Sequence, residues 1–307
     1  MLKSQPGDNM TVDHEFGGQH TDLKLRVVEE YLRFFATALS KHFENLVYID
    51  AFAGTGKRTV RVEAKAGDLL EEAVQESVEQ RRGSAQIAID VEPHFSRLIF
   101  IEENPRYCAA LAEIASAHPD RKIDVIQGDA NAEMHRVLRS INWAGTRGVL
   151  FLDPYGMEVD WSTLAAAAAT GAIDVWFLFS LSGLYRQATL NKRSIDDDKR
   201  RALNRILGAE HWEKELYSKP KGQDLFGENF EEMRTIGVRG LENFVKARLE
   251  TIFPKVFEPL RLPSGPGPQR YSLFCAISNA SPKAIGLATK AANHILKAGI
   301  SSKNLPR

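Results

Sequence analysis

The sequence has few cysteines and no net charge. Its 307 residues include only two cysteines, Cys108 and Cys275, which are too few for a disulfide framework or a cysteine-rich metal site. We therefore predict no metal site, and expect both thiols to be unreactive core residues. Forty basic and forty acidic residues cancel, so no overall positive field indicates nucleic-acid binding. That balance still allows local basic patches.

Segments that would direct the chain into or across a membrane are also lacking. No apolar run is long enough to span a bilayer, and residues 1–20 are polar, without the apolar region of a secretory signal. We expect a cytoplasmic protein without a membrane partner. The composition is 43% hydrophobic, which is enough for a substantial core in one or two domains. Residues 1–20 are expected to be a flexible N-terminus, and residues 301–307 a tail.

The most informative stretch is an apolar strand, residues 47–49, that leads into Asp50-Ala51-Phe52-Ala53-Gly54-Thr55-Gly56. The two glycines let the backbone turn tightly and let a ligand approach it. Ligands of open α/β sheets lie beyond the carboxyl ends of the strands. The pattern therefore predicts a nucleotide-type cofactor site.

Four interpretations of this turn compete. A dinucleotide-binding loop needs a third glycine and a later acid, and neither is obvious. A phosphate-binding P-loop needs a glycine separated by four residues from Gly56-Lys57, where Ala51 stands. The stretch also resembles the first motif of amino-methyltransferases that use S-adenosylmethionine (SAM). The fourth interpretation is a plain strand-to-helix turn.

Further strands predict the fold class. Apolar segments at 97–102, 123–126, 148–152 and 173–179 alternate with helical patterns, which argues for a parallel, doubly wound sheet. Segments 257–262 and 271–277 are too close for a crossover helix and predict an antiparallel hairpin. We therefore expect an α/β protein with a mostly parallel, seven-stranded, Rossmann-like methyltransferase sheet, an antiparallel C-terminal hairpin and a helical insertion.

The expected domain, residues 21–300, carries insertions near 57–82 and 187–252. Within the first, the charged segment 68–82 predicts a surface helix. Within the second, segments 200–207, 209–217 and 230–253 look helical. Basic residues there could meet phosphates, although a solvated face is the favoured interpretation: Lys192, Arg193, Lys199, Arg200, Arg201 and Arg205.

Two acids follow predicted strands at the same edge of the sheet. Glu102 ends an apolar run and is preferred to Glu103 as an acceptor for ribose hydroxyls, the alternative being an exposed strand end. Asp129 could accept from an adenine amino group, cap the next helix, or do both. The planar amide of Asn131 could also bind a ligand.

The strand at 148–152 ends in Asp153-Pro154-Tyr155-Gly156. Proline has a fixed φ and no N–H, so its carbonyl can point outward at little conformational cost. The carboxylate of Asp153 beside that carbonyl makes two acceptors suited to an exocyclic amine. The ring of Tyr155 can stack on a flat base, a contact of about 1–3 kcal/mol in nucleic-acid binding. The alternative is a proline turn with a capping Asp and a core Tyr.

Taken in order, these motifs resemble the three-Cys-motif partner protein family. The resemblance spans about residues 20–297 and is most specific at residues 151–156 and at Val159-Asp160-Trp161. It implies a SAM-dependent methyltransferase-like fold and a radical-SAM-like partner that carries three cysteines. It also implies a SAM site formed by Asp50, Phe52, Gly54, Gly56, Glu102, Asp129 and Ala130, and catalytic residues Asp153, Pro154 and Tyr155.

The resemblance implies N-methylation of an exocyclic amine, such as that of a nucleobase in DNA or RNA. Adenine-N6 enzymes usually carry two prolines in this motif, whereas this chain carries only Pro154 and so looks closer to certain tRNA guanine-N2 enzymes. The target base stays open. One alternative is a catalytically silent SAM-binding protein that assists the partner. Another is nucleotide hydrolysis through Gly56-Lys57.

Overall fold

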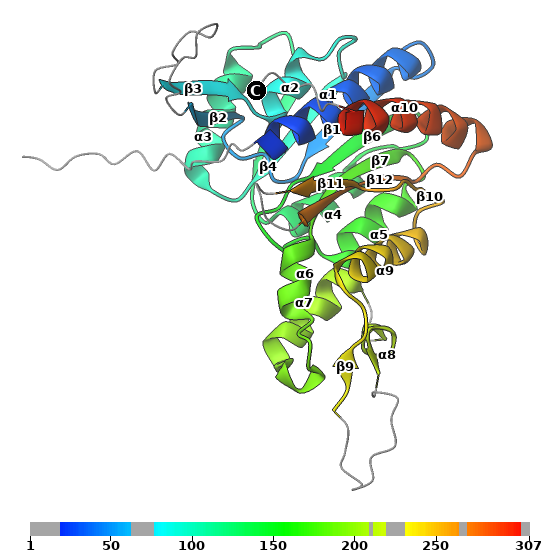
Figure 1. The fold of residues 1–307 in the computed structure, drawn as a ribbon. Coiled ribbons are helices and arrows are strands. Elements are labelled where there is room, and N and C mark those ends of the chain that lie inside the picture. Colours follow the sequence, from blue (N-terminus) through cyan, green and yellow to red (C-terminus); the bar gives the residue numbers. More distant parts are fainter. Residues whose placement is uncertain (1–18, 63–76, 209–210, 219–230, 264–268, 302–307) are drawn as a thin grey trace, which may run out of the picture.

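A central mixed sheet organises the computed structural model, which describes residues 19–62, 77–208, 211–218, 231–263 and 269–301. The strands lie in the order β10-β12-β7-β6-β1-β4-β5, and β11 also pairs with β12 (Figure 1). Their bounds are β1 (Asn45–Asp50), β4 (Arg97–Glu102), β5 (Ile123–Gln127), β6 (Thr146–Leu152), β7 (Ile173–Ser180), β10 (Lys255–Val256), β11 (Leu260–Pro263) and β12 (Gln269–Ile277).

Strand directions confirm the expected fold class. Strands β5, β4, β1, β6 and β7 are parallel, and β12 runs antiparallel to β7. Strands β10 and β11 both pair antiparallel with β12, near its opposite ends, so together they fill one position at the edge. Seven positions result, with the first strand central and an antiparallel hairpin at one end. This is the layout of a Rossmann-like methyltransferase sheet.

Successive residues of the central strands enter two separate cores. In β6, for example, Val149 and Phe151 pack in one core, whereas Leu150 and Leu152 pack in the other. This is the two-residue period of a strand covered on both faces. The first core also takes residues from α1 (Gln19–Leu39), α2 (Ser84–Asp90), α3 (Pro105–Ser116) and α10 (Pro282–Ser301), and α1 lies beside α10 (Figure 1). The second takes residues from α4 (Ala130–Ser140), α5 (Trp161–Ala169), α6 (Leu181–Gln187), α7 (Asp197–Leu207), α8 (Trp212–Leu216) and α9 (Val238–Glu250).

The first insertion contains a hairpin instead of the expected helix over 68–82. Strands β2 (Lys57–Val62) and β3 (Ser77–Arg82) pair antiparallel, with Lys57 opposite Arg82. The prediction is therefore wrong for residues 77–82, and residues 63–76 lie outside the described residues. The β-branched Thr59, Val60 and Val62 suit a strand. The residues of β3 carry no strand pattern of their own, and β3 forms by pairing with β2.

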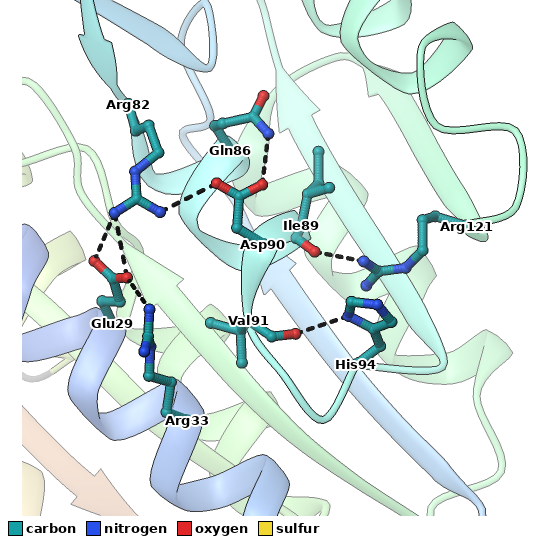
Figure 2. Close-up of polar contacts among 9 residues, drawn as sticks. All are labelled: Glu29, Arg33, Arg82, Gln86, Ile89, Asp90, Val91, His94 and Arg121. Atoms are coloured by element: carbon teal, nitrogen blue, oxygen red, sulfur yellow. Dashed lines mark hydrogen bonds and ion pairs between the residues drawn. The ribbon is translucent and has the colours of Figure 1, made fainter.

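Arg82 ties this hairpin to two helices (Figure 2). Its Nη2 lies 3.2 Å from Glu29 Oε2 of α1, and its Nη1 lies 3.1 Å from Asp90 Oδ2 of α2. Gln86 donates a 2.8 Å hydrogen bond to the other oxygen of Asp90, and Arg33 lies 2.8 Å from Glu29. The ion pairs are partly exposed, and such pairs contribute about 0–1 kcal/mol each. The network orients the hairpin more than it stabilises the fold.

The second insertion is partly helical and partly extended. After α6 come a short 3-10 helix, η1 (Lys192–Ser194), then α7, α8, and a two-strand pair of β8 (Tyr217–Ser218) and β9 (Met233–Arg234). The helix expected over 230–253 begins only at Val238, after Gly237, because Met233 and Arg234 pair with β8. The helix expected over 209–217 covers 212–216, and residues 209–210 lie outside the described residues.

Candidate functional site

The candidate site lies at the carboxyl edge of the parallel strands. Asp50 ends β1, Glu102 ends β4, and Asp153 directly follows β6. Asp50 pairs in register with Phe100 of β4 and Phe151 of β6, two residues before Glu102 and Asp153. The sheet therefore brings together three of the acids expected from the sequence.

Glu102 holds the glycine turn that follows β1. Its Oε2 accepts a 2.8 Å hydrogen bond from the Gly54 N–H, and its Oε1 accepts a 2.9 Å bond from the Asn104 N–H. The side chain is buried. Each carboxylate oxygen can accept more than one bond, so Glu102 keeps acceptor capacity for a ribose hydroxyl. Its preference over the exposed Glu103 fits these contacts.

The two glycines of the turn differ in their surroundings. Both have positive φ, +59° at Gly54 and +71° at Gly56, which favours glycine. A Cβ on Gly54 would meet nothing within 4 Å, whereas a Cβ on Gly56 would lie 2.7 Å from Ile114 Cδ1 and 3.1 Å from Leu111 Cδ2. Ligand approach is therefore open at Gly54, and Gly56 serves the packing of the turn on α3.

Asp50 sits beneath the turn and is fully buried. It accepts hydrogen bonds from the Phe52 N–H at 3.3 Å, from the Tyr48 hydroxyl at 3.4 Å, and from the Ser84 hydroxyl. Burial raises the pKa of Asp50 to about 7, and the nearby charge of Asp153 adds to the rise against the lowering by these donors. Asp50 thus supports the turn from inside.

Asp129 and its neighbours begin α4. Asp129 is exposed and caps the helix by accepting a 2.8 Å bond from the Ala132 N–H, and Ala130 is buried. Asn131 binds protein groups: its amide donates to the Glu158 carbonyl at 2.8 Å, and its oxygen accepts from the Asp160 N–H and the Thr163 hydroxyl at 2.9 and 2.8 Å. Asn131 therefore anchors the loop after β6.

Sequence reasoning missed a residue that contacts Asp153. Lys24, in α1, forms an ion pair with Asp153 Oδ2. The Lys24 side chain is 8% exposed and that of Asp153 is 25% exposed. Within the described ranges, Asp153 Oδ1 accepts no hydrogen bond. The helical pattern does show that Lys24 lies off the main apolar stripe of α1, but nothing local indicates its partner 129 positions later.

The other two residues of the motif differ in exposure. Pro154 is buried, while the Tyr155 side chain is 60% exposed. Partial burial, together with the neighbouring Tyr107, Glu102 and Asp153, raises the pKa of Tyr155 to about 12, so its hydroxyl stays protonated at neutral pH. An exposed ring beside the acids at the ends of β4 and β6 has a position suited to stacking on a planar group.

Basic residues of the second insertion are paired with acids. The six residues considered as phosphate contacts each form an ion pair: Lys192 with Glu213 and Glu232, Arg193 with Glu231, Lys199 with Asp196, Arg200 with Glu213, Arg201 with Asp198, and Arg205 with Asp160. These partners support a solvated, charge-balanced face over a phosphate-binding one.

The structure removes the nucleotide-hydrolysis alternative. Lys57 is exposed and begins strand β2 rather than a helix, and among the described residues after it the first helix begins at Ser84. A P-loop needs a helix directly after its glycine-lysine pair. Across the described part of the chain, no cluster of three metal-ligating side chains occurs and no helix is long and apolar enough to cross a membrane.

Comparisons with known proteins give remote similarities only. No family model matches the chain, and no curated protein matches it. Among solved structures, a Legionella pneumophila protein of family DUF519 shares 13% identity over 92% of this chain and 95% of its own, with a TM-score of 0.49. The N-terminal domain of EvdMO1, solved in the presence of SAH and D-fucose, shares 11% over 88% and 91%, with a TM-score of 0.40.

A third structure, TYW2 from M. jannaschii in complex with AdoMet, shares 10% identity over 85% of this chain and 76% of its own, with a TM-score of 0.34. All three TM-scores lie below 0.5. The fold assignment therefore rests on the strand order and directions of the sheet described above.

Proposed function

We propose that the protein is a SAM-dependent N-methyltransferase that acts on an exocyclic amine of a nucleobase in DNA or RNA. The observation that carries this proposal is the pairing of two features at one sheet edge. One is the turn at Gly54, held by Glu102 and open above the glycine. The other is the carboxylate of Asp153, with one oxygen bound and the other open.

The residues of the edge fit SAM. Gly54 leaves room for the methionine end, Glu102 keeps acceptors for the ribose hydroxyls, and Asp129 is exposed where an adenine amino group would need an acceptor. When bound, SAM supplies an electrophilic methyl group, so that an N–C bond forms from the amine lone pair while the C–S bond breaks and its electrons stay on sulfur.

The chain's own contribution is binding and orientation. Asp153 Oδ1 and the Pro154 carbonyl accept the two N–H groups of the amine and aim its lone pair at the methyl group. Tyr155 stacks on the base, which must be single-stranded or flipped out. Such positioning can supply about 7–11 kcal/mol of the barrier. The proton left on the methylated amine passes to water.

The proposal extends to membership of the three-Cys-motif partner family and to a radical-SAM-like protein as partner. It rests on the motif order: the Asp153-Pro154-Tyr155-Gly156 stretch directly follows β6, and the downstream Asp160-Trp161 pair stands where α5 begins. In the structure Asn131 anchors the loop after β6 through Asp160. Co-purification of the partner from co-expressing cells tests this part separately.

Calorimetric titration with SAM tests the cofactor. We expect micromolar binding, about −8 kcal/mol, that is lost in Gly54→Asp and Glu102→Ala and retained in the matched control Glu103→Ala.

Transfer of labelled methyl groups from SAM to RNA and DNA pools tests the reaction. We expect Asp153→Ala to abolish this transfer. SAM binding without transfer to any pool would instead support the accessory role, and no binding by folded protein would contradict both.

A further inference from the structure

Lys24 is a buried ammonium group whose anionic partner is the candidate catalytic carboxylate. Its side chain is 8% exposed and bonds Asp153 Oδ2. Its Nζ also lies 6.0 Å from the centre of the Phe151 ring, over the strand that leads to Asp153. A buried ammonium is costly unless paired, so the ion pair with Asp153 offsets the cost of burying this lysine.

Helix α1 presents Lys24 from a fixed position. Leu25 and Val28 are buried in the core on the same helix. The Tyr31 hydroxyl donates a 2.7 Å bond to Asp174 of β7, and Glu29 pairs with Arg82 of the hairpin (Figure 2). Because α1 is anchored along its length, the backbone at Lys24 is fixed. Binding Asp153 therefore costs little additional backbone entropy. Lys24 can therefore set the orientation of its partner.

Asp153 needs such a group because its surroundings are acidic. Asp50 lies close enough for the two carboxylates to repel each other, and the hydroxyls of Tyr48 and Tyr155 also face Asp153. Among the described residues, Lys24 is the cation that forms an ion pair with Asp153. Without it, neither oxygen of Asp153 would be held by a hydrogen bond among the described residues.

We propose that Lys24 is the positioning residue of the active site: it fixes Asp153 through Oδ2 and so leaves Oδ1 directed as an acceptor for the substrate amine. This inference rests on the proposed function. It also narrows the substrate class to an amine with N–H groups to donate, since the oxygen that Lys24 leaves open is a hydrogen-bond acceptor.

An ion pair with a merely structural role would have other consequences. It would add stability, and the orientation of Asp153 would not matter to the reaction. Lys24→Met and Lys24→Arg separate these cases, because arginine keeps the charge while methionine keeps only the length. Arg26→Met is the matched control, since Arg26 is an exposed cation on the same helix.

The first measurement is the position of the Asp153 side chain in crystal structures of the wild type, Lys24→Met, Lys24→Arg and Arg26→Met. We expect the Asp153 carboxylate to leave its wild-type position in Lys24→Met, to return to it in Lys24→Arg, and to keep it in Arg26→Met. An unmoved carboxylate in folded Lys24→Met overturns the proposal. This result requires neither SAM nor substrate.

The second measurement separates this proposal from the proposed function. SAM affinity by calorimetry should be the same in Lys24→Met as in the wild type, while methyl transfer falls about tenfold or more and recovers partly in Lys24→Arg. Equal transfer rates in Lys24→Met and wild type overturn the positioning role. A wild type that binds no SAM contradicts the proposed function, while the position of the Asp153 carboxylate in Lys24→Met still decides whether Lys24 orients Asp153.

Discussion

The Gly54 N–H donates a 2.8 Å hydrogen bond to Glu102 Oε2, so the turn after β1 and the end of β4 form one unit. Hydrogen bonds to charged groups contribute about 1.5–3 kcal/mol each. Since Glu102 accepts from both Gly54 and Asn104, Glu102→Ala should lower the free energy of unfolding by about 2–4 kcal/mol. Urea denaturation measures this, with Glu103→Ala as control. An effect no larger than that of the control would contradict the linkage.

The two glycines of the turn should respond differently to alanine. At Gly56 the new Cβ would lie 2.7 Å from Ile114 Cδ1 in addition to adopting positive φ, so Gly56→Ala should cost about 2–4 kcal/mol of stability. Gly54→Ala meets no atom and should cost only about 1–2 kcal/mol. Gly54→Ala should nevertheless weaken SAM binding more, because its methyl group enters the open space. Thermal melts and calorimetry together test the pair.

Stability should depend on pH through Asp50. Burial raises its pKa from 3.8 to about 7, so the folded state binds the proton more tightly than the unfolded state does. This group's contribution to the free energy of unfolding is therefore greatest below pH 4 and declines as pH rises to 7, by about 4 kcal/mol in all. Asp50→Asn lacks this decline.

The measurement for Asp50 is urea denaturation of wild type and Asp50→Asn at several pH values between 4 and 8. Relative to the wild type, the variant should become steadily more stable with rising pH up to about 7. A difference that is constant over this range would contradict the raised pKa. Asp174, whose pKa is likewise about 7 through burial, should behave in the same direction in Asp174→Asn.

Arg82 should hold the hairpin in a salt-dependent way. Its pairs with Glu29 and Asp90 are partly exposed, so Arg82→Met should lower global stability by about 1 kcal/mol or less. Hydrogen exchange at the amides of β2 and β3 should nevertheless become faster, and raising the salt concentration should speed exchange in the wild type toward the variant. Equal exchange in both proteins would show that the hairpin is held by other contacts.

Local sequence signals predicted most strands of the central sheet, but not the short strands that form by pairing in the two insertions. The apolar run 97–102 ending in Glu102 gives β4 with its observed bounds, because a buried parallel strand is marked by its own residues. Val78 and Arg82 carry no such mark, and their strand exists only beside β2. Segment 230–253 likewise mixes helix with a short strand because Met233 and Arg234 pair with a distant segment.

The site shows the same division. Asp50, Glu102 and Asp153 could be found from the sequence because each stands at or directly after the end of an apolar strand. Lys24 could not, because its role depends on how α1 packs on the sheet. A partial rotation of α1 about its axis would point Lys24 away from Asp153. The roles of Gly56 and Asn131 were also invisible, since both depend on neighbours, Ile114 and the loop at 158–160, that are distant in sequence.

The ion pairs of the second insertion bear on how the protein would meet a polyanion. Binding of a nucleic acid is driven largely by release of counterions from phosphates, which requires cations that are free to replace them. Lys192, Arg193 and Arg200 are already neutralised by Glu213, Glu231 and Glu232. Any nucleic acid held against this segment would gain little from such release, so discrimination would depend on the shape and stacking of the base rather than on the charge of its backbone.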